Sequence, residues 1–437
     1  MNSTPNRQKV YVVDGLRTPF LKTSGGPNPF SAADLALQAG RAVMLRQPLS
    51  TQLLDEVILG CVAPAADEVN IARVVALRLG CDVHTPAWTV QRNCGSGMQA
   101  LDTAVRRIGR GEASLILAGG VEAMSRAPLQ FNQGFSRWMG GLMRARGQLA
   151  KLKAALAWRP GFMAPVVTLL KALTDPTTGL SMGQTAENLA HRFAIQRLAM
   201  DGYAVRSHQR AAAAWEEGRM ADEVVPLFDK RGRHYDHDDG IRPDSQEEKL
   251  ARLKPVFDRP HGRITAGNSA QITDGAVMLL LADEAMVARY GLEPLGTLQP
   301  AQWVGLAPEQ MGLGPAHAIA PLLKELQMEL GEVDLWEINE AFAAQVIACH
   351  EALADGDYCE QELAVDHPLG RINPARLNVD GGAVSLGHPV GASGARIVLH
   401  LLHALRQRHM QRGVAALCIG GGQGGAMMVE SMGGGAS

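Results

Sequence analysis

The chain has 437 residues, 46% of them hydrophobic and 20% charged, and its 42 basic side chains nearly balance 44 acidic ones for a net charge of -2. This length exceeds one ordinary hydrophobic core and predicts two or three domains, or a duplicated one. The balanced charge does not indicate a nucleic-acid partner, and no run reaches the roughly 18 uninterrupted apolar residues of a membrane span.

Short apolar runs alternate with longer helical patterns in the first part of the chain. The beginning has an apolar run too short for a signal peptide, so we expect a cytoplasmic protein. The runs Val10 to Gly15, Glu56 to Val62 and Ser114 to Gly120 predict strands, and an Ala/Leu-rich segment from Ser31 predicts a helix. This alternation predicts an α/β architecture with buried strands.

The alternation stops between residues 127 and about 270. No acidic residue occurs between Glu122 and Asp175. The basic residues of this stretch are Arg126, Arg137, Arg144, Arg146, Lys151, Lys153, Arg159 and Lys171. Much of the stretch is amphipathic, and two interpretations stay open. It is either a helical insertion with a solvated basic face, or a surface for anionic partners such as phospholipid head groups or the phosphates of a ligand.

The last part of the chain repeats the α/β pattern. The sequence "CGSGMQALDTAV" followed by "LILAGG" resembles "VGASGARIVLHL" followed by "ALCIGG". Each pair combines a start of small residues, a helix, a strand and a Gly-Gly stop. We therefore expect two α/β halves of similar topology that pack together.

Cys94 is the first candidate for chemistry. The six cysteines contain no CxxC pair and no metal-ligand spacing, so we predict neither a metal site nor a disulfide framework. Cys94 lies in "QRNCGSGMQAL", where a predicted strand meets a helix and glycines allow a sharp turn. A thiol at a helix start faces the positive end of the dipole, so we expect its pKa to fall below the free value of about 8.5.

Three further residues extend this site. His388 precedes a proline in the Gly-rich turn "GHPVGASGAR" and is the candidate base for a cysteine nucleophile. Cys418 ends a strand before three glycines, whose N–H groups suit an oxyanion, and it is a candidate proton carrier. Asn339 in "NEAFAAQ" is either a helix N-cap or a hydrogen-bonding group of the site. The set predicts acyl transfer through a covalent intermediate, with proton abstraction beside a carbonyl.

Longer motifs carry a resemblance over almost the whole chain. In order they are "DGLRTPF", "NCGSGMQAL", "AGGVEAMS", "MGQTAEN", "IRPD" with "LARLKPVFD", "TAGNSAQITDGA", "MGLGP", "NEAFAAQ", "GGAVSLGHPVGASGAR" and "CIGGGQGGA". In these motifs the chain resembles the thiolase family of acyl-CoA C-acyltransferases, which includes acetyl-CoA acetyltransferases and 3-ketoacyl-CoA thiolases.

The resemblance implies a duplicated thiolase-type fold in five layers, α-β-α-β-α, with an inserted loop domain. It divides the chain into an N-terminal half (1–126), a loop domain (127–271) with a basic amphipathic segment (131–178), a return to the N-terminal half (272–296) and a C-terminal half (297–437). It also implies a homodimer or homotetramer, CoA and acyl-CoA as substrates, and no permanently bound cofactor.

The resemblance also assigns roles to the candidate residues. Cys94 would be acylated by 3-ketoacyl-CoA after activation by His388, and Cys418 would exchange a proton with C2 of acetyl-CoA or with incoming CoA. Asn339 and the histidine would hold a water in one oxyanion site, and the N–H groups of Cys94 and Gly420 would form the other.

Contacts to CoA and the acyl chain are implied at a further set of positions. These are Met182, Phe257, Ala266, Met311, Ala341 and Phe342. The serine that contacts pantetheine in the family would fall at Ala270, so Ser269, one place earlier, is the nearest hydroxyl.

The segment 131–178 favours a degradative 3-ketoacyl-CoA thiolase of fatty-acid β-oxidation. It is longer than in short-chain acetoacetyl-CoA thiolases and is similar to the insertion in thiolase subunits of fatty-acid oxidation complexes. Those insertions meet the membrane or a hydratase/dehydrogenase partner, although the subunits usually carry histidine at the position of Asn339.

Other functions remain open. The nearest alternative is a biosynthetic acetoacetyl-CoA thiolase that uses the same residues. Ketoacyl synthases share the fold, but the second cysteine, Cys418, argues against them. A non-catalytic CoA or lipid carrier, or a membrane-docking subunit, is a more remote alternative.

Overall fold

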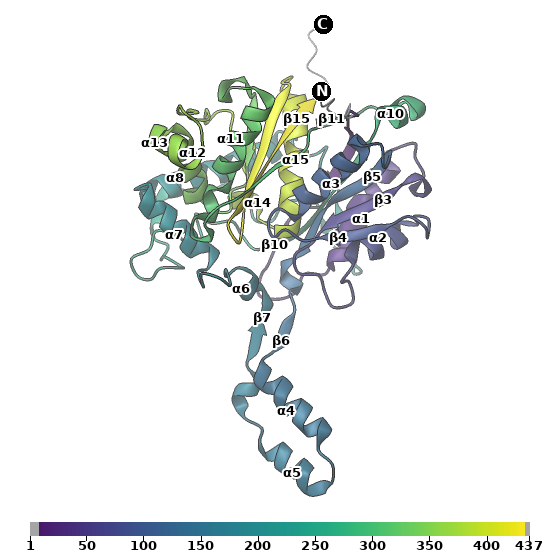
Figure 1. Cartoon of the computed structure of the whole chain (residues 1–437), viewed down its shortest axis with the longest axis vertical. Coiled ribbons are helices and arrows are strands. Elements are labelled where there is room, and N and C mark those ends of the chain that lie inside the picture. The colour runs from purple at the N-terminus through teal and green to yellow at the C-terminus, as the bar shows by residue number, and fades with distance from the viewer. Residues whose placement is uncertain (1–7, 433–437) are drawn as a thin grey trace, which may run out of the picture.

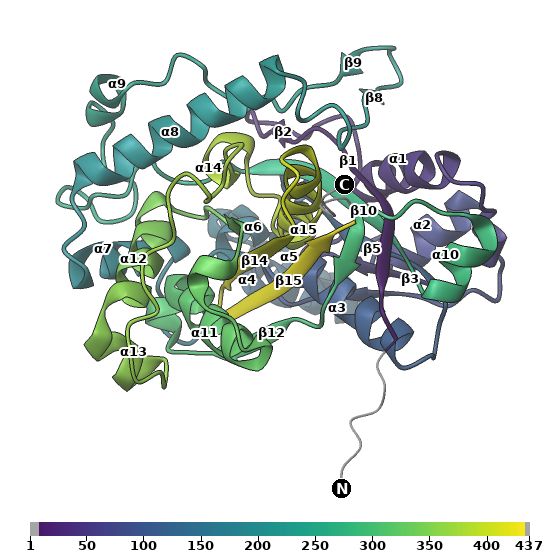
Figure 2. The same ribbon diagram turned by 90° about the horizontal axis from the view of Figure 1, so that it is seen from above.

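Helices and half-sheets stack in the order α-β-α-β-α, as the resemblance implied (Figures 1 and 2). The computed structural model describes residues 8–432. The ends of the predicted halves, residues 1–7 and 433–437, lie outside the described residues.

The first half-sheet comes from the N-terminal part of the chain and one strand that returns to it. Its members are β1 (Tyr11–Arg17), β2 (Leu21–Lys22), β3 (Glu56–Gly60), β4 (Ala87–Val90), β5 (Leu115–Ala123) and β10 (Thr273–Ala282). β3 runs parallel to β4 and β5, whereas β10 lies antiparallel between β1 and β5. All residues of β5 and β10 are buried, because helices cover both faces.

Helices α1 (Ala32–Leu45) and α2 (Ile71–Leu79) cover the outer face of this half-sheet. Ser31 begins α1 with a capping box: its hydroxyl accepts the N–H of Asp34, and the Asp34 carboxylate accepts the N–H of Ser31, each at 3.2 Å. The helix predicted from Ser31 is therefore confirmed.

The second half-sheet contains β11 (Gly296–Leu298), β12 (Gln302–Gly305), β13 (Leu335–Ile338), β14 (Arg412–Ile419) and β15 (Gln423–Ser431). Helix α11 (Gly314–Leu326) packs on β14 and β15, and α12 (Ala343–Ala354) packs beside α11. A short antiparallel pairing of β1 with β11 joins the two half-sheets into one 11-stranded sheet.

The middle layer consists of α3 (Ser96–Gly109) and α15 (Val390–Gln407), the two helices whose sequences align (Figure 2). They pack against each other, and α15 also contacts β5, β10 and β14. Their close approach requires glycine, because a Cβ on Gly97 would lie 2.9 Å from the backbone nitrogen of Ala395. The predicted duplication thus places both helix starts side by side.

The remaining helices and strands complete the body. They are η1 (Thr51–Leu53), η2 (Met124–Arg126), α7 (Met182–Arg192), α8 (Arg197–Glu216), β8 (Leu227–Phe228), β9 (His234–Tyr235), α9 (Glu247–Ala251), α10 (Glu284–Tyr290), η4 (Pro308–Leu313), η5 (Leu330–Glu332), α13 (Gly356–Glu362) and α14 (Ala383–Leu386). Buried Arg17 of β1 binds Glu223 at 2.6 Å and both carboxylate oxygens of Asp238. Losing one partner would leave a buried charge uncompensated, so this contact holds the loop after α8 on the sheet.

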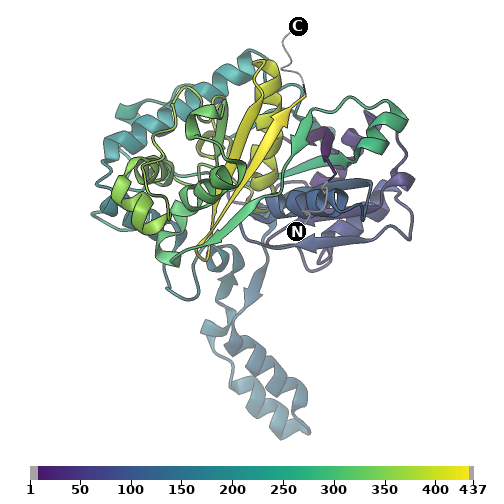
Figure 3. The ribbon, with the colours of Figure 1, turned by 45° about the horizontal axis from the view of Figure 1, so that its top comes forward.

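A helical hairpin projects from the body on a two-stranded stalk (Figures 1 and 3). It contains β6 (Leu129–Phe131), α4 (Gln133–Arg144), α5 (Gln148–Leu156), η3 (Pro160–Met163), β7 (Pro165–Val167) and α6 (Thr168–Ala172). No residue of α4 or α5 is buried. The segment is not helical throughout, because Val166 and Val167 lie on β7, which pairs with β6. Among residues 8–432, no helix has the length and apolar character needed to cross a membrane.

Candidate active site

Cys94 lies in a tight turn between β4 and α3, as the sequence predicted. Asn93 adopts a positive φ of 43°. The Ser96 hydroxyl accepts the N–H of Arg92 at 2.9 Å and donates to the carbonyl of Asn93 at 2.7 Å, which fixes the turn. Cys94 itself is half-buried and lines a pocket, so its thiol is accessible to a ligand.

The expectation of a lowered pKa at Cys94 is wrong. Burial raises the pKa of this thiol to about 11, although N–H groups of Gly420 and of Cys94 itself oppose the rise. The loss of water around the thiolate outweighs the N–H groups at the helix start. Cys94 is therefore a neutral thiol at pH 7 and needs a base to become a nucleophile.

His388 has one ring nitrogen engaged in a hydrogen bond and one without a partner. The Ser393 hydroxyl donates to the carbonyl of Pro389 at 3.1 Å, and it lies 2.6 Å from Nδ1 of His388. A hydroxyl has one hydrogen, so Nδ1–H is the donor to Ser393, and Nε2 carries the free lone pair. Nε2 is buried and has no partner among the described residues. Burial lowers the pKa of His388 to about 4, so the ring is neutral at pH 7.

The histidine loop depends on glycine. Gly387 has a φ of 105°, and a Cβ there would lie 2.2 Å from the side chain of Thr273. The N–H of His388 donates to the carbonyl of Gln271 at 3.0 Å. Gly387 therefore allows the backbone to pass against Thr273 and fixes the start of the His388 loop.

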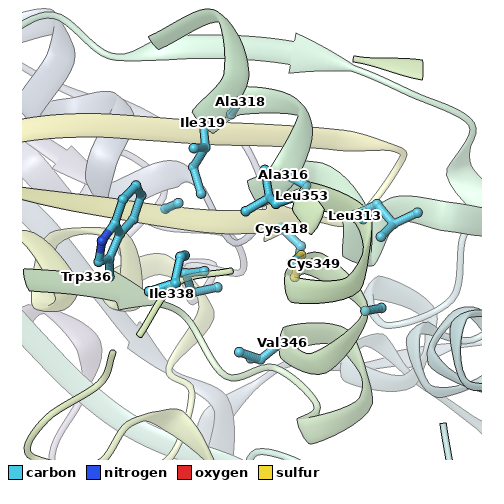
Figure 4. Packing of buried hydrophobic residues seen from close by; sticks show 14 of the residues in the cluster. Leu313, Ala316, Ala318, Ile319, Trp336, Ile338, Val346, Cys349, Leu353 and Cys418 are labelled. Atoms are coloured by element: carbon cyan, nitrogen blue, oxygen red, sulfur yellow. The ribbon is translucent and has the colours of Figure 1, made fainter. Parts of the chain in front are cut away.

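Cys418 occupies a more apolar environment than Cys94. Alternate residues of β14 face opposite sides, and Cys418 faces the outer cluster that contains Leu313, Ile338 and Cys349 (Figure 4). It is 1% exposed. Burial, then the nearby thiols of Cys94 and Cys349, raise its pKa well above the ordinary value. Cys418 is therefore a neutral proton donor near Cys94.

Asn339 is not a helix N-cap. Helix α12 begins at Ala343 with Phe342 before it, so the N-cap alternative is excluded. The side chain of Asn339 is fully buried, and both of its amide atoms lack a hydrogen-bond partner among the described residues. Buried amides normally have partners, so this one is available to a ligand or a water.

Gly420 joins the two halves at the nucleophile. Its carbonyl accepts the side-chain N–H of Asn93 at 2.8 Å, while its backbone N–H lowers the pKa of Cys94. A Cβ on Gly420 would lie 3.1 Å from the flexible Met182 side chain and 3.8 Å from Nδ2 of Asn93. The N–H groups of Cys94 and Gly420 thus both lie beside the sulfur of Cys94.

Sequence reasoning singled out no role for Glu122, although it lies in the quoted "AGGVEAMS". This buried carboxylate accepts the N–H groups of Val62, Ala63 and Gly391 at 2.9–3.1 Å and lines the same pocket as Cys94. Burial raises its pKa to about 7. An acidic residue directly after the apolar run of β5 was the signal that could have identified it.

The predicted CoA and acyl contacts fall into three groups. Met182 lines the Cys94 pocket. Four others pack in one cluster that Met182 and Cys418 also touch: Phe257, Met311, Ala341 and Phe342. Ala266 is exposed on a loop, and the hydroxyl of Ser269 donates to the carbonyl of Thr265 at 2.7 Å. The Ser269 hydroxyl is therefore turned into its own loop.

Comparisons with known proteins identify the family of this chain. The family models "Thiolase, N-terminal domain" and "Thiolase, C-terminal domain" match residues 10–285 and 292–431. A beta-ketoadipyl-CoA thiolase of Pseudomonas aeruginosa is 39% identical over 97% of this chain and 99% of its own. A 3-ketoacyl-CoA thiolase of Serratia proteamaculans is 35% identical over 98% of both chains. The crystal structure of human mitochondrial 3-ketoacyl-CoA thiolase in complex with CoA has a TM-score of 0.83 at 36% identity, covering 97% of this chain and 98% of its own.

Proposed function

This chain belongs to the thiolase family and is an acyltransferase with CoA thioesters as substrates, and from that premise we propose that it cleaves 3-ketoacyl-CoA with CoA in fatty-acid β-oxidation. The products are acetyl-CoA and an acyl-CoA that is two carbons shorter. Thiolases need no permanently bound cofactor, so the side chains of the protein move every proton.

In the first half-reaction, Nε2 of His388 accepts the proton of the Cys94 thiol. The thiolate attacks the C3 carbonyl, and the C2–C3 bond breaks. Cys418 donates its proton to C2, which releases acetyl-CoA and leaves an acyl thioester on Cys94. Asn339 and His388 stabilise the enolate oxygen through a water, and the N–H groups of Cys94 and Gly420 stabilise the C3 oxyanion.

In the second half-reaction, the Cys418 thiolate accepts the proton of the incoming CoA thiol. The CoA thiolate attacks the acyl thioester, and the sulfur of Cys94 leaves and recovers its proton from His388. Both cysteines and the histidine return to their starting states. The two half-reactions share one intermediate, so ping-pong kinetics are expected.

One observation carries this proposal: thiols from both halves of the chain converge on one site. Cys94 receives an N–H group from Gly420, and its thiol lies close enough to Cys418 to raise the pKa of the latter. The unpartnered Nε2 of His388 adds a base to this pair. A carrier that only binds CoA would need neither the paired thiols nor the base.

The direction of the reaction and the identity of the acyl group are also part of the proposal. One relative is named for 3-ketoacyl-CoA and another for beta-ketoadipyl-CoA, and both names describe cleavage substrates with a 3-keto group. These names support the degradative direction over biosynthetic acetoacetyl-CoA formation. Thiolysis confined to acetoacetyl-CoA would favour the biosynthetic alternative.

The test combines kinetics with mapping of the acylated residue. The purified protein is incubated with 3-ketoacyl-CoAs of increasing chain length, and the added acyl mass is located by peptide mapping, with Cys94→Ala as control. We expect acyl mass on the Cys94 peptide and release of acetyl-CoA from the unmodified protein, and neither from Cys94→Ala. No adduct and no cleavage with any chain length would contradict the proposal and favour the carrier alternative.

We also propose that the helical hairpin contacts an anionic lipid surface. Its residues Met143, Leu149 and Leu156 are about four-fifths exposed, at 80%, 86% and 77%. Basic side chains lie among them, and no acidic residue occurs between Glu122 and Asp175. Exposed apolar side chains beside basic ones fit the boundary between headgroups and acyl chains.

Co-sedimentation with vesicles tests this contact. Binding to phosphatidylglycerol vesicles, and weaker binding to phosphatidylcholine vesicles, is expected for the full chain. The double substitution Lys151→Gln with Lys153→Gln should weaken binding, since each basic residue near an anionic surface contributes about 1 kcal/mol. Lys254→Gln in the body is the matched control. Equal binding to both vesicle types, or binding unchanged in the double variant, would contradict the contact.

A further inference from the structure

Two cavities meet at the root of the hairpin, where α6 returns to the body. Leu169 and Ala172 of α6 line the Cys94 pocket. Thr168, Lys171 and again Ala172 line a second cavity of about 410 Å³. Val62, Ala63 and Asn93 belong to the walls of both cavities. A group that leaves the Cys94 pocket past Ala172 therefore enters the second cavity.

The first cavity is small and apolar. It has a volume of about 30 Å³, and its apolar side chains include Met124, Leu173 and Met182. This volume is far smaller than the 410 Å³ of the second cavity, so a longer acyl group on Cys94 has more room beyond the wall that the two cavities share.

The lining of the second cavity is mixed, with apolar side chains, several polar side chains and one positive charge. Its polar side chains are Gln91, Asn93, Gln130, Thr168, Lys171 and Thr174. Among the described residues that line it, Lys171 is the only charged one. A cavity with amides, hydroxyls and one ammonium group favours an anionic end over a hydrocarbon end.

No carboxylate from the flanking sequence, Glu122 to Asp175, neutralises the charge of Lys171. The sequence has no acidic residue between Glu122 and Asp175. Glu122 accepts the N–H groups of Val62 and Ala63, and Asp175 accepts the N–H and hydroxyl of Thr177. Both flanking carboxylates are thus engaged in the backbone turns beside the cavity, which leaves the ammonium group of Lys171 for a ligand.

We propose that the second cavity is a subsite for the far end of the acyl group and selects 3-ketoacyl-CoA substrates whose acyl chain ends in a carboxylate, paired with Lys171. This inference rests on the proposed thiolysis and specifies its substrate class. Cleavage of a six-carbon substrate of this kind leaves a four-carbon acyl group on Cys94 with a carboxylate at its end. The bonds that form and break are those of the two half-reactions above.

Two six-carbon substrates that differ only in the terminal group test the subsite. The value of kcat/KM is measured for 3-ketoadipyl-CoA and 3-ketohexanoyl-CoA. The unmodified protein should prefer 3-ketoadipyl-CoA. Lys171→Gln should lower kcat/KM for 3-ketoadipyl-CoA by about fivefold, the size expected for a solvent-exposed ion pair, and leave the value for 3-ketohexanoyl-CoA unchanged. Lys171→Glu should reverse the preference.

Two further measurements separate a specific subsite from a general charge effect. Lys153→Gln, on α5 and outside the cavity, is the matched control and should change neither value. Salt should reduce the preference of the unmodified protein, because exposed charges are screened. The subsite would be overturned if Lys171→Gln left the ratio of the two kcat/KM values unchanged. It would also be overturned if the variant lost kcat/KM equally for both substrates and its KM for CoA rose.

Failure of the subsite and failure of the proposed function give different results. If the unmodified protein cleaves 3-ketohexanoyl-CoA and 3-ketoadipyl-CoA with equal kcat/KM, thiolysis stands and the subsite is overturned. If it cleaves neither substrate and forms no adduct on Cys94, the proposed function fails, and the subsite fails with it.

Discussion

Cys94 and Cys418 lie near the same substrate pocket, but the two halves of the molecule surround them differently. Cys94 lies in a turn at a helix start, half-buried, with N–H groups directed at its sulfur. Cys418 lies within strand β14, 1% exposed, and faces an apolar cluster (Figure 4). The turn exposes one sulfur to attack a carbonyl, whereas the strand encloses the other.

The comparison shows that burial, rather than the helix dipole, determines the protonation of both thiols. Both pKa values are raised, and removal from water is the largest cause in each case. A neutral thiol is a poor nucleophile but a suitable proton donor. Cys94 therefore depends on His388, while Cys418 can donate as it stands. The predictions below test this division, from the largest expected effect to the smallest.

Removing each thiol should have a different effect on the two half-reactions. Cys94→Ala should abolish acylation and lower turnover by roughly 10⁴-fold or more, since the covalent route is lost. Cys418→Ala should lower turnover by roughly 10² to 10⁴, the contribution of a placed acid or base, and still acquire acyl mass on Cys94. Rapid-quench mass spectrometry distinguishes the two. Equal loss of the adduct in both variants would contradict the division.

Gly119, within β5, and Gly420, directly after β14, align in the sequence and should respond unequally to a methyl group. A Cβ on Gly119 would lie 2.0 Å from the carbonyl oxygen of Val277 in the neighbouring strand, whereas the nearest atom to one on Gly420 is the sulfur of Met182, 3.1 Å away. Gly119→Ala should lower the free energy of unfolding by about 3 kcal/mol, because the backbone must shift. Gly420→Ala should lower it by less than about 1 kcal/mol. Urea denaturation measures both, and similar values would contradict the asymmetry.

The base of Cys94 should fail at low pH. The lowered pKa of His388, about 4, keeps Nε2 unprotonated above that value. Activity should therefore be insensitive to this group near pH 7 and be lost as the pH falls through about 4. Ser393→Ala removes the hydroxyl that accepts the N–H of Nδ1. The ring can then also carry its proton on Nε2, where it cannot accept the proton of Cys94, so kcat should fall by roughly tenfold.

The pH profile of kcat/KM tests this orientation, since a merely structural role for Ser393 would not change its shape. Thr103→Ala, which removes a hydroxyl that donates to the carbonyl of Gln99 within α3, is the control. An unchanged profile and rate in Ser393→Ala would argue against the orientation by the hydroxyl.

The third thiol near Cys418 should matter least. Cys349 donates to the carbonyl of Gly312 at 3.2 Å and contributes to the raised pKa of Cys418. Cys349→Ala should lower the free energy of unfolding by about 1 kcal/mol and change turnover by less than about twofold. Thermal unfolding and steady-state assays measure these values. A loss as large as that of Cys418→Ala would assign the proton transfer to Cys349.

Elements that depend on local patterns could be predicted. The strand from Ser114, the helix start after Cys94 and the capped helix after Ser31 lie within a few residues of their predicted bounds, because periodicity, caps and glycines act over short distances. The stretch 142–170 was harder, because apolar residues on two helices and a short strand have similar spacing. The order of the strands in the sheet required long-range pairing.

The site divides in the same way. Cys94, His388 and Cys418 could be found because small residues surround each of them in the sequence. The pKa of Cys94 could not be predicted, since the turn is local but the burial of the thiol arises only when the chain folds. Glu122 also escaped, because its partners Val62, Ala63 and Gly391 come together only in the folded chain.

The sequence by itself determined the reactive groups, their order and the duplicated helix and strand pattern, because these follow from residue types and short spacings. Only the tertiary structure decided which thiol is less buried and which nitrogen of His388 is free. It also decided that Lys171 lines the cavity beside the Cys94 pocket. Desolvation and hydrogen-bond partners depend on residues hundreds of positions apart, and they exist only after the two halves pack together.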